Sequence, residues 1–111
     1  MLVTEQQVEK ALTFLADTDG EFANWRGQML RTEHLFDVAK ALAFKHLKGE
    51  GLGVEESRQL AITTEAVQKA HEDYVKCVVA WENLRARRKR AEITIDLYRT
   101  AEASRRKGTL N

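Results

Sequence analysis

The sequence predicts an all-α protein: an antiparallel long helical hairpin, or coiled coil, with a short N-terminal helix, which is oligomeric. Seam residues recur at spacings of three and four through the second half of the chain, as one side of a helix packed on another requires. The chain has no proline, and no glycine lies between Gly53 and Gly108, so nothing in the backbone interrupts a helix there. The seam alternates Leu60, Val67, Tyr74, Trp81, Arg88 and Ile95 with Thr63, Ala70, Cys77, Leu84, Ala91 and Tyr98.

The first half of the chain predicts two helices. Thr4, followed three residues later by Gln7, matches a capping box, and a short helix is expected over residues 4–17. The segment Asp17–Gly20 predicts a stop or kink, because glycine weakens a helix and Asp19 is able to cap the next one. A second helix is then expected over residues 20–48.

Residues 49–53 predict the chain reversal, since three of these five residues are glycines that tolerate positive φ. A long third helix is expected over residues 54–107, continuous from Glu55 to Arg105. Because a short loop makes neighbouring helices antiparallel, residue i should lie near residue 103 − i. The 111 residues are expected to form a single helical-hairpin domain.

Residues 74–81 are apolar on nearly every side of a helix, more than one hairpin partner covers. A homo-oligomer built around this stretch is therefore expected. The alternative is a few singly exposed valines, which soluble proteins tolerate. The expected oligomer interface comprises Tyr74, Val75, Val78, Val79 and Trp81.

The chain has no apolar run of membrane-spanning length and a single cysteine, Cys77, which favours a cytoplasmic protein without a disulfide framework. Its formal net charge of +1 hides an asymmetry. Residues 1–83 hold 9 Lys and Arg against 14 Asp and Glu, a net −5, whereas residues 84–111 hold 9 against 3, a net +6. An acidic front and a basic tail predict either self-complementary assembly or an anionic partner.

Five cations within residues 85–90 are the sharpest local signal, because such a run neutralises phosphates without reading sequence. Trp81 and Tyr98 flank the run, and aromatic rings of this kind stack on unpaired bases. The alternative to nucleic-acid binding is a purely structural role. In that case the two rings pack in the seam, and acidic residues on the opposite helix neutralise the basic run. The run is Arg85, Arg87, Arg88, Lys89 and Arg90; the acids are Asp17, Asp19 and Glu21; a second basic cluster is Arg105, Arg106 and Lys107.

Nothing in the sequence predicts an enzyme, a metal site or a cofactor. His34, His46 and His71 lack the spacing of a zinc-binding helix. Cys77 has no paired histidine and sits in the seam, where an inert thiol is expected. No nucleophile, base and orienting group occur together.

The first arm of the hairpin carries Leu30, Arg31 and Glu33, a glycine-rich reversal follows, and the second arm carries Tyr74, Leu84 and a basic ending with Ile95, Tyr98 and Arg99. With this pattern the helical hairpin resembles small bacteriophage proteins, and most of all the recombination mediator family of T-even phages, the UvsY type. The resemblance covers residues 21–100 and implies an oligomer in the host cytoplasm that binds single-stranded DNA and helps to load a recombinase onto strands coated with single-strand-binding protein. A C-terminal oligomerisation segment of the family is missing here. The resemblance implies DNA-binding roles for Arg85, Arg87, Arg88, Lys89, Arg90 and Arg99.

Two other functions stay open. One is an inhibitor of a host nuclease or defence complex, in which the acidic front mimics nucleic acid. The other is a structural coiled-coil adaptor without a nucleic-acid ligand.

Overall fold

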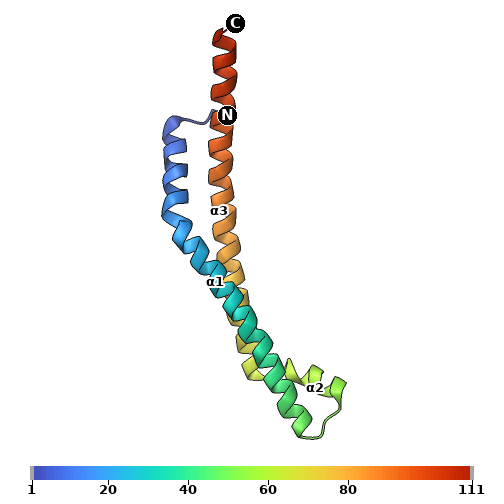
Figure 1. The fold of residues 1–111 in the computed structure, drawn as a ribbon. Helices are drawn as coiled ribbons and strands as arrows, with labels where there is room; N and C mark the ends of the chain where they lie inside the picture. The colour runs from blue at the N-terminus through green and yellow to red at the C-terminus, as the bar shows by residue number, and fades with distance from the viewer. Residues whose placement is uncertain (1, 111) are drawn as a thin grey trace. The chain divides into compact units, whose positions relative to one another are not determined.

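The computed structural model describes residues 2–110, and side chains through residue 108. Within this range it contains three helices and no strand: α1 (Glu5–Gly49), α2 (Val54–Ala61) and α3 (Glu65–Leu110) (Figure 1). The predicted all-α class and the pairing of two long helices are confirmed.

The chain divides into two compact units. Unit 1 comprises residues 2–23 and 82–110, so it pairs the beginning of α1 with the C-terminal half of α3. Unit 2 comprises residues 24–81 and holds the rest of α1, the whole of α2 and the first part of α3.

The capping box at the start of α1 is confirmed. The Thr4 backbone N–H donates to Gln7 Oε1 at 2.8 Å, and the Gln7 N–H donates to Thr4 Oγ1 at 3.1 Å. These reciprocal bonds satisfy two amide groups that the first turn of a helix leaves without intrahelical partners.

The predicted helix end at Asp17–Gly20 is wrong, because α1 runs without interruption from Glu5 to Gly49. The separate helices expected over residues 4–17 and 20–48 are one helix. A helical glycine costs only about 1 kcal/mol relative to alanine, which packing readily offsets. Here Thr18 is buried and its hydroxyl donates to the Phe14 carbonyl at 2.7 Å, which holds this turn in the helix.

The reversal lies where the glycines predict it. Helix α1 ends at Gly49, and Gly51 has a φ of 91°, a conformation that side-chain-bearing residues rarely adopt. Gly53 then precedes the first residue of α2.

The predicted continuity of the long helix is also wrong, because residues 62–64 separate α2 from α3. The hydroxyls of Thr63 and Thr64 donate to the carbonyls of Leu60 and Ala61 at 2.7 and 2.8 Å, and the backbone N–H groups of both threonines donate to the same two carbonyls. Threonine side chains compete in this way with the regular helical ladder. A pair of threonines followed by an acid favours the start of a new helix, and the sequence-based prediction overlooked this signal.

The seam on α3 is confirmed from Val67 to Tyr98. Val67, Leu84, Ala91 and Ile95 are buried, whereas Leu60 and Thr63, which precede α3, are exposed. In unit 1, Ala91 and Ile95 pack with Ala11, and Val8, Phe14 and Leu15 lie against this cluster.

The predicted register is met by some contacts and exceeded by others. In unit 1, Arg88 contacts Leu15 and Tyr98 contacts Glu5, as the rule of 103 − i requires. Arg88 also reaches Asp19 and Phe22, four and seven positions beyond that rule. In unit 2, the Phe36 ring lies against His71 and Tyr74 at the same two offsets.

Replacing Gly20 by alanine should stabilise the protein by about 0.5–1 kcal/mol, because α1 is continuous here and the added Cβ meets no atom within 4 Å. The same replacement at Gly51 should destabilise it by about 1 kcal/mol, because alanine is strained at its positive φ. Urea unfolding followed by circular dichroism measures both changes. A loss of stability in Gly20→Ala would contradict a helical conformation at this residue.

Candidate nucleic-acid interface

The predicted basic run lies entirely in unit 1, on the two turns of α3 that follow Leu84. The run wraps around the helix, so its members face different surroundings. Arg88 is half-buried. The other four cations of the run are exposed: Arg85, Arg87, Lys89 and Arg90.

Arg88 points inward and joins α3 to α1. Its Nη1 donates to the Leu15 carbonyl at 2.9 Å and to Thr18 Oγ1 at 2.7 Å, and its Nη2 donates to Asp19 Oδ1 at 2.7 Å. The guanidinium carbon also lies 5.0 Å from the centre of the Phe22 ring. The Arg88 side chain is only 16 % exposed, so this cation takes part in the helix pairing. Its expected role in nucleic-acid binding stays a prediction.

The next cations form weaker, local contacts. Arg85 Nη1 lies 3.8 Å from Glu82 and Lys89 Nζ lies 4.0 Å from Glu92, both at the limit of an ion pair and both between exposed side chains. Arg87 lies over the Phe14 ring, with 4.8 Å from guanidinium carbon to ring centre. Exposed pairs of this kind contribute about 0–1 kcal/mol, so a polyanion is able to replace them.

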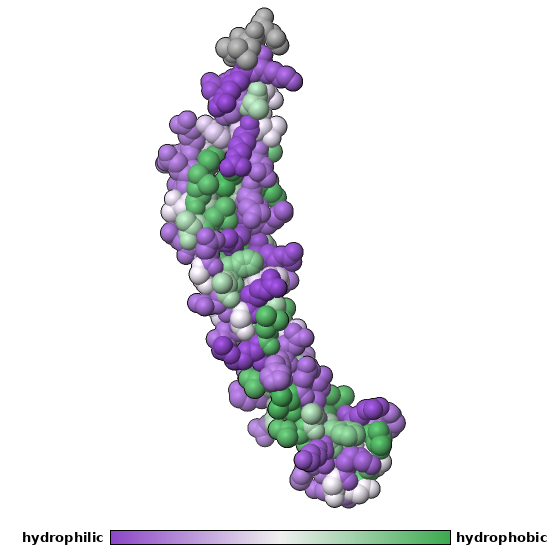
Figure 2. Space-filling model, in the orientation of Figure 1, coloured by the Kyte–Doolittle hydropathy of each residue, from purple (hydrophilic) through white to green (hydrophobic). Residues whose placement is uncertain are grey.

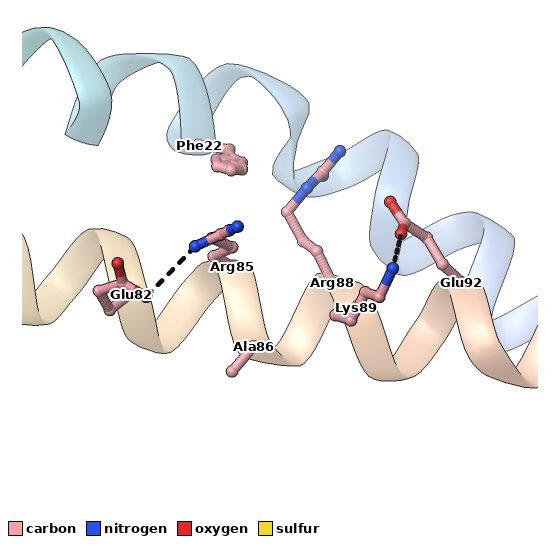
Figure 3. A pocket seen from close by; sticks show the side chains of 7 residues that line it. All are labelled: Phe22, Glu82, Arg85, Ala86, Arg88, Lys89 and Glu92. Atoms are coloured by element: carbon pink, nitrogen blue, oxygen red, sulfur yellow. Dashed lines mark ion pairs between the residues drawn. The ribbon is translucent and has the colours of Figure 1, made fainter.

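A groove of about 520 Å³ opens beside the run. Phe22 lines it from α1, and Arg85 and Arg88 extend from α3 toward that helix (Figure 3). The Lys89–Glu92 and Arg85–Glu82 pairs lie at its edge on α3 (Figure 3). An aromatic ring among cations is the combination by which single-strand binders hold bases and phosphates together.

Sequence reasoning missed Phe22 as a candidate and selected Trp81 and Tyr98 instead. Trp81 belongs to unit 2 and is half-buried with a buried Nε1, and Tyr98 is half-buried in unit 1. Both therefore follow the seam-packing alternative. Phe22 lies seven residues after Leu15, so its heptad spacing alone indicated a packing role and gave no sign of the groove.

Basic side chains continue along α3 beyond the run. Arg90 and Arg99 are exposed, and the structure gives neither an ion pair among the described residues. Arg99 lines a second groove with Glu5 and Tyr98, whose hydroxyl donates to Glu5 Oε1 at 3.2 Å. Loss of hydration, followed by the charges of Glu102 and Glu5, raises the pKa of Tyr98.

The cluster at the end of α3 is partly neutralised. Arg105 Nη2 donates to Glu102 at 2.7 Å, and this bond raises the pKa of the guanidinium. Arg106 and Lys107 are exposed beside it.

The expected oligomer interface is split by the structure. Tyr74, Val78 and Trp81 are half-buried within unit 2, whereas Val75 and Val79 are 42 % and 51 % exposed. Hydrophobic side chains also reach the surface elsewhere, between hydrophilic ones, on the face drawn in Figure 2.

Among the described residues no cluster of histidine, cysteine and carboxylate side chains is placed to hold a metal ion. Cys77 is a free, half-buried thiol. None of the described helices has a stretch both long and apolar enough to cross a membrane.

Comparisons with known proteins return no matching family model, no matching curated protein and no matching solved structure.

Replacing Arg88 by lysine should lower the free energy of unfolding by about 1–3 kcal/mol. A single ammonium cannot reproduce the planar fork that reaches the Leu15 carbonyl, Thr18 and Asp19 at once, and it leaves partly buried acceptors without donors. Arg90→Lys, the same change at an exposed position of the same helix, should change stability by less than about 0.5 kcal/mol. Equal effects in urea unfolding would show that Arg88 does not hold the helices together.

Proposed function

We propose that unit 1 binds single-stranded nucleic acid without strong sequence preference, through the exposed basic side of α3 and the Phe22 groove. The observation that carries the proposal is the placement of a half-buried aromatic ring in a groove lined by Arg85 and Lys89, two exposed cations of the run. Arg99, fourteen residues after Arg85, extends this basic surface along the same helix, whereas Arg90 lies on the other side of α3.

The charges of α3 support this choice of ligand. Residues 82–111 hold 9 Lys and Arg against 4 Asp and Glu. Each phosphate contact with a single strand releases counterions and contributes about −0.7 to the slope of log K against log salt. A handful of such contacts gives a dissociation constant on the order of micromolar at low salt, without base-specific hydrogen bonds.

The place of such binding in phage DNA recombination is a further part of the proposal, and it rests on the resemblance to recombination mediators. A mediator must hold a strand through its backbone, because it acts on any sequence. Exposed cations on a helix bind phosphates of any sequence, and an aromatic ring stacks on any base. The two together meet this requirement.

The inhibitor alternative uses the opposite charge. Glu9, Asp17 and Glu21 are exposed on α1 in unit 1 and present carboxylates where a nucleic-acid mimic needs them. Absence of binding to any oligonucleotide at low salt would favour this function over the proposed one.

Neutralising the two exposed cations that line the groove, with Arg85→Gln and Lys89→Gln together, should weaken binding to a fluorescent single-stranded oligonucleotide. The salt slope should become shallower by about 1.4, the equivalent of two phosphate contacts. Fluorescence anisotropy across a salt series measures both changes. The matched control is Arg26→Gln with Lys48→Gln, which removes the same two charges from exposed positions in unit 2. Equal weakening in both double variants would mean that net charge, and not this surface, drives binding.

Replacing Phe22 by leucine should weaken binding by about 1 kcal/mol, or roughly fivefold, because it removes the ring and keeps an apolar side chain. The loss should persist at high salt, where phosphate contacts contribute least. Phe14→Leu is the matched control, since Phe14 lies in unit 1 but lines a different groove. If Phe14→Leu weakens binding as much, the Phe22 ring has no specific part in it.

A further inference from the structure

Unit 2 carries a row of exposed apolar side chains on α1. Leu35, Val38 and Leu42 follow one another at spacings of three and four, which places them on one face of the helix. They are 53 %, 38 % and 63 % exposed. We name these three residues the α1 stripe.

A second row lies on α3 in the same unit. Val75 and Val79 are four residues apart, so they also share a face, and both are exposed. We name these two residues the α3 stripe. A ring contact between Phe36 and Tyr74 joins α1 to α3 in unit 2, and Leu35 lines a groove beside this pairing with Ala66 and Ala70 of α3. The α1 stripe therefore begins at the border of the pairing.

The interior of unit 2 is small. Among its described residues only Ser57, Ala61 and Val67 are buried. Two long helices in one layer bury a single seam, and helical proteins complete such a core with a further layer of helices. The stripes are exposed apolar surfaces on which such a layer is able to pack.

The charges beside the two stripes are opposite. Arg31 and Lys45 continue the α1 stripe at the same helical spacing, four residues before Leu35 and three after Leu42. Glu72 continues the α3 stripe, three residues before Val75. Lys45 and Glu72 are both exposed, and the structure gives neither an ion pair among the described residues.

Charge and register together select one pairing. If two α1 stripes met about Val38 in antiparallel fashion, Arg31 of one copy would face Lys45 of the other, which like charges disfavour. If an α1 stripe meets an α3 stripe in antiparallel fashion, one register brings together Val38 with Val79, Leu42 with Val75, and Lys45 with Glu72. The residue numbers of each of these three pairs add to the same value, so all three form at once. In this register Leu35 lies opposite Glu82, so Val38 and Leu42 supply the apolar contact.

We propose that copies of this chain associate head to tail through unit 2, with the α1 stripe of one copy packed against the α3 stripe of the next. Such a contact uses two different surfaces, so it generates a ring where the rotation closes and an open stack where it does not. Of the residues first expected at the oligomer interface, Val75 and Val79 keep that role, and the α1 stripe supplies their partners.

The test is a complementation between two variants, each with one stripe disabled. Leu42→Glu removes the α1 stripe and Val75→Glu removes the α3 stripe. Sedimentation velocity of the wild-type chain at tens of micromolar should show a mass that rises with concentration, and each variant alone should stay monomeric. An equimolar mixture of the two variants should form a one-to-one dimer, because the intact α1 stripe of one fits the intact α3 stripe of the other.

The control variant is Leu30→Glu, which places the same charge at an exposed leucine of α1 in unit 2 that lies off the stripe. It should associate as the wild-type chain does, and circular dichroism should give equal helix content in all three variants. A monomeric wild-type chain, or a mixture that stays monomeric while the wild-type chain associates, would overturn the proposal.

A charge exchange tests the register. Lys45→Glu alone and Glu72→Lys alone should each weaken association, and both changes in one chain should restore it. Failure of the double variant to recover would overturn the proposed pairing of Lys45 with Glu72. Nucleic-acid binding is measured on unit 1 residues, so the two proposals succeed or fail separately.

Discussion

The hydrogen bonds of Arg88 are the interaction on which unit 1 depends. One guanidinium reaches a main-chain carbonyl, a buried hydroxyl and a carboxylate on the opposite helix, and its planar fork satisfies all three at once. A cation in a helix seam is costly unless it is paired in this way. The seam position of Arg88 therefore fixes which turn of α1 must face it, and with it the register of the unit.

The same interaction explains why α1 continues through its weakest segment. Residues 17–20 combine two aspartates, a threonine and a glycine, a composition that favours the end of a helix. Arg88 binds three groups of this turn and the turn before it, and each bond requires the helical position of its acceptor. Tertiary contact here overrides local preference.

Arg88 also separates the cations by role. It draws one guanidinium of the run into the fold and leaves its neighbours exposed on α3, where Arg85 and Lys89 lie near exposed acids and Arg87 lies over the Phe14 ring. A helix places consecutive residues 100° apart, so a dense basic run cannot present every charge to one ligand. The division of the run between one cation in the helix pairing and four exposed cations follows from this geometry.

The sequence by itself determined the helical class, the capping box at Thr4, the reversal at Gly49–Gly53 and the buried seam of α3, because each depends on local chemistry or on a period that survives in any helical packing. Only the tertiary structure decided the continuity of α1, the interruption at residues 62–64 and the Phe22 groove. In each of these cases a side-chain hydrogen bond or a contact between distant residues outweighed a local preference of about 1 kcal/mol. Because these local preferences are small, the contacts that a residue forms in the folded chain decide its conformation.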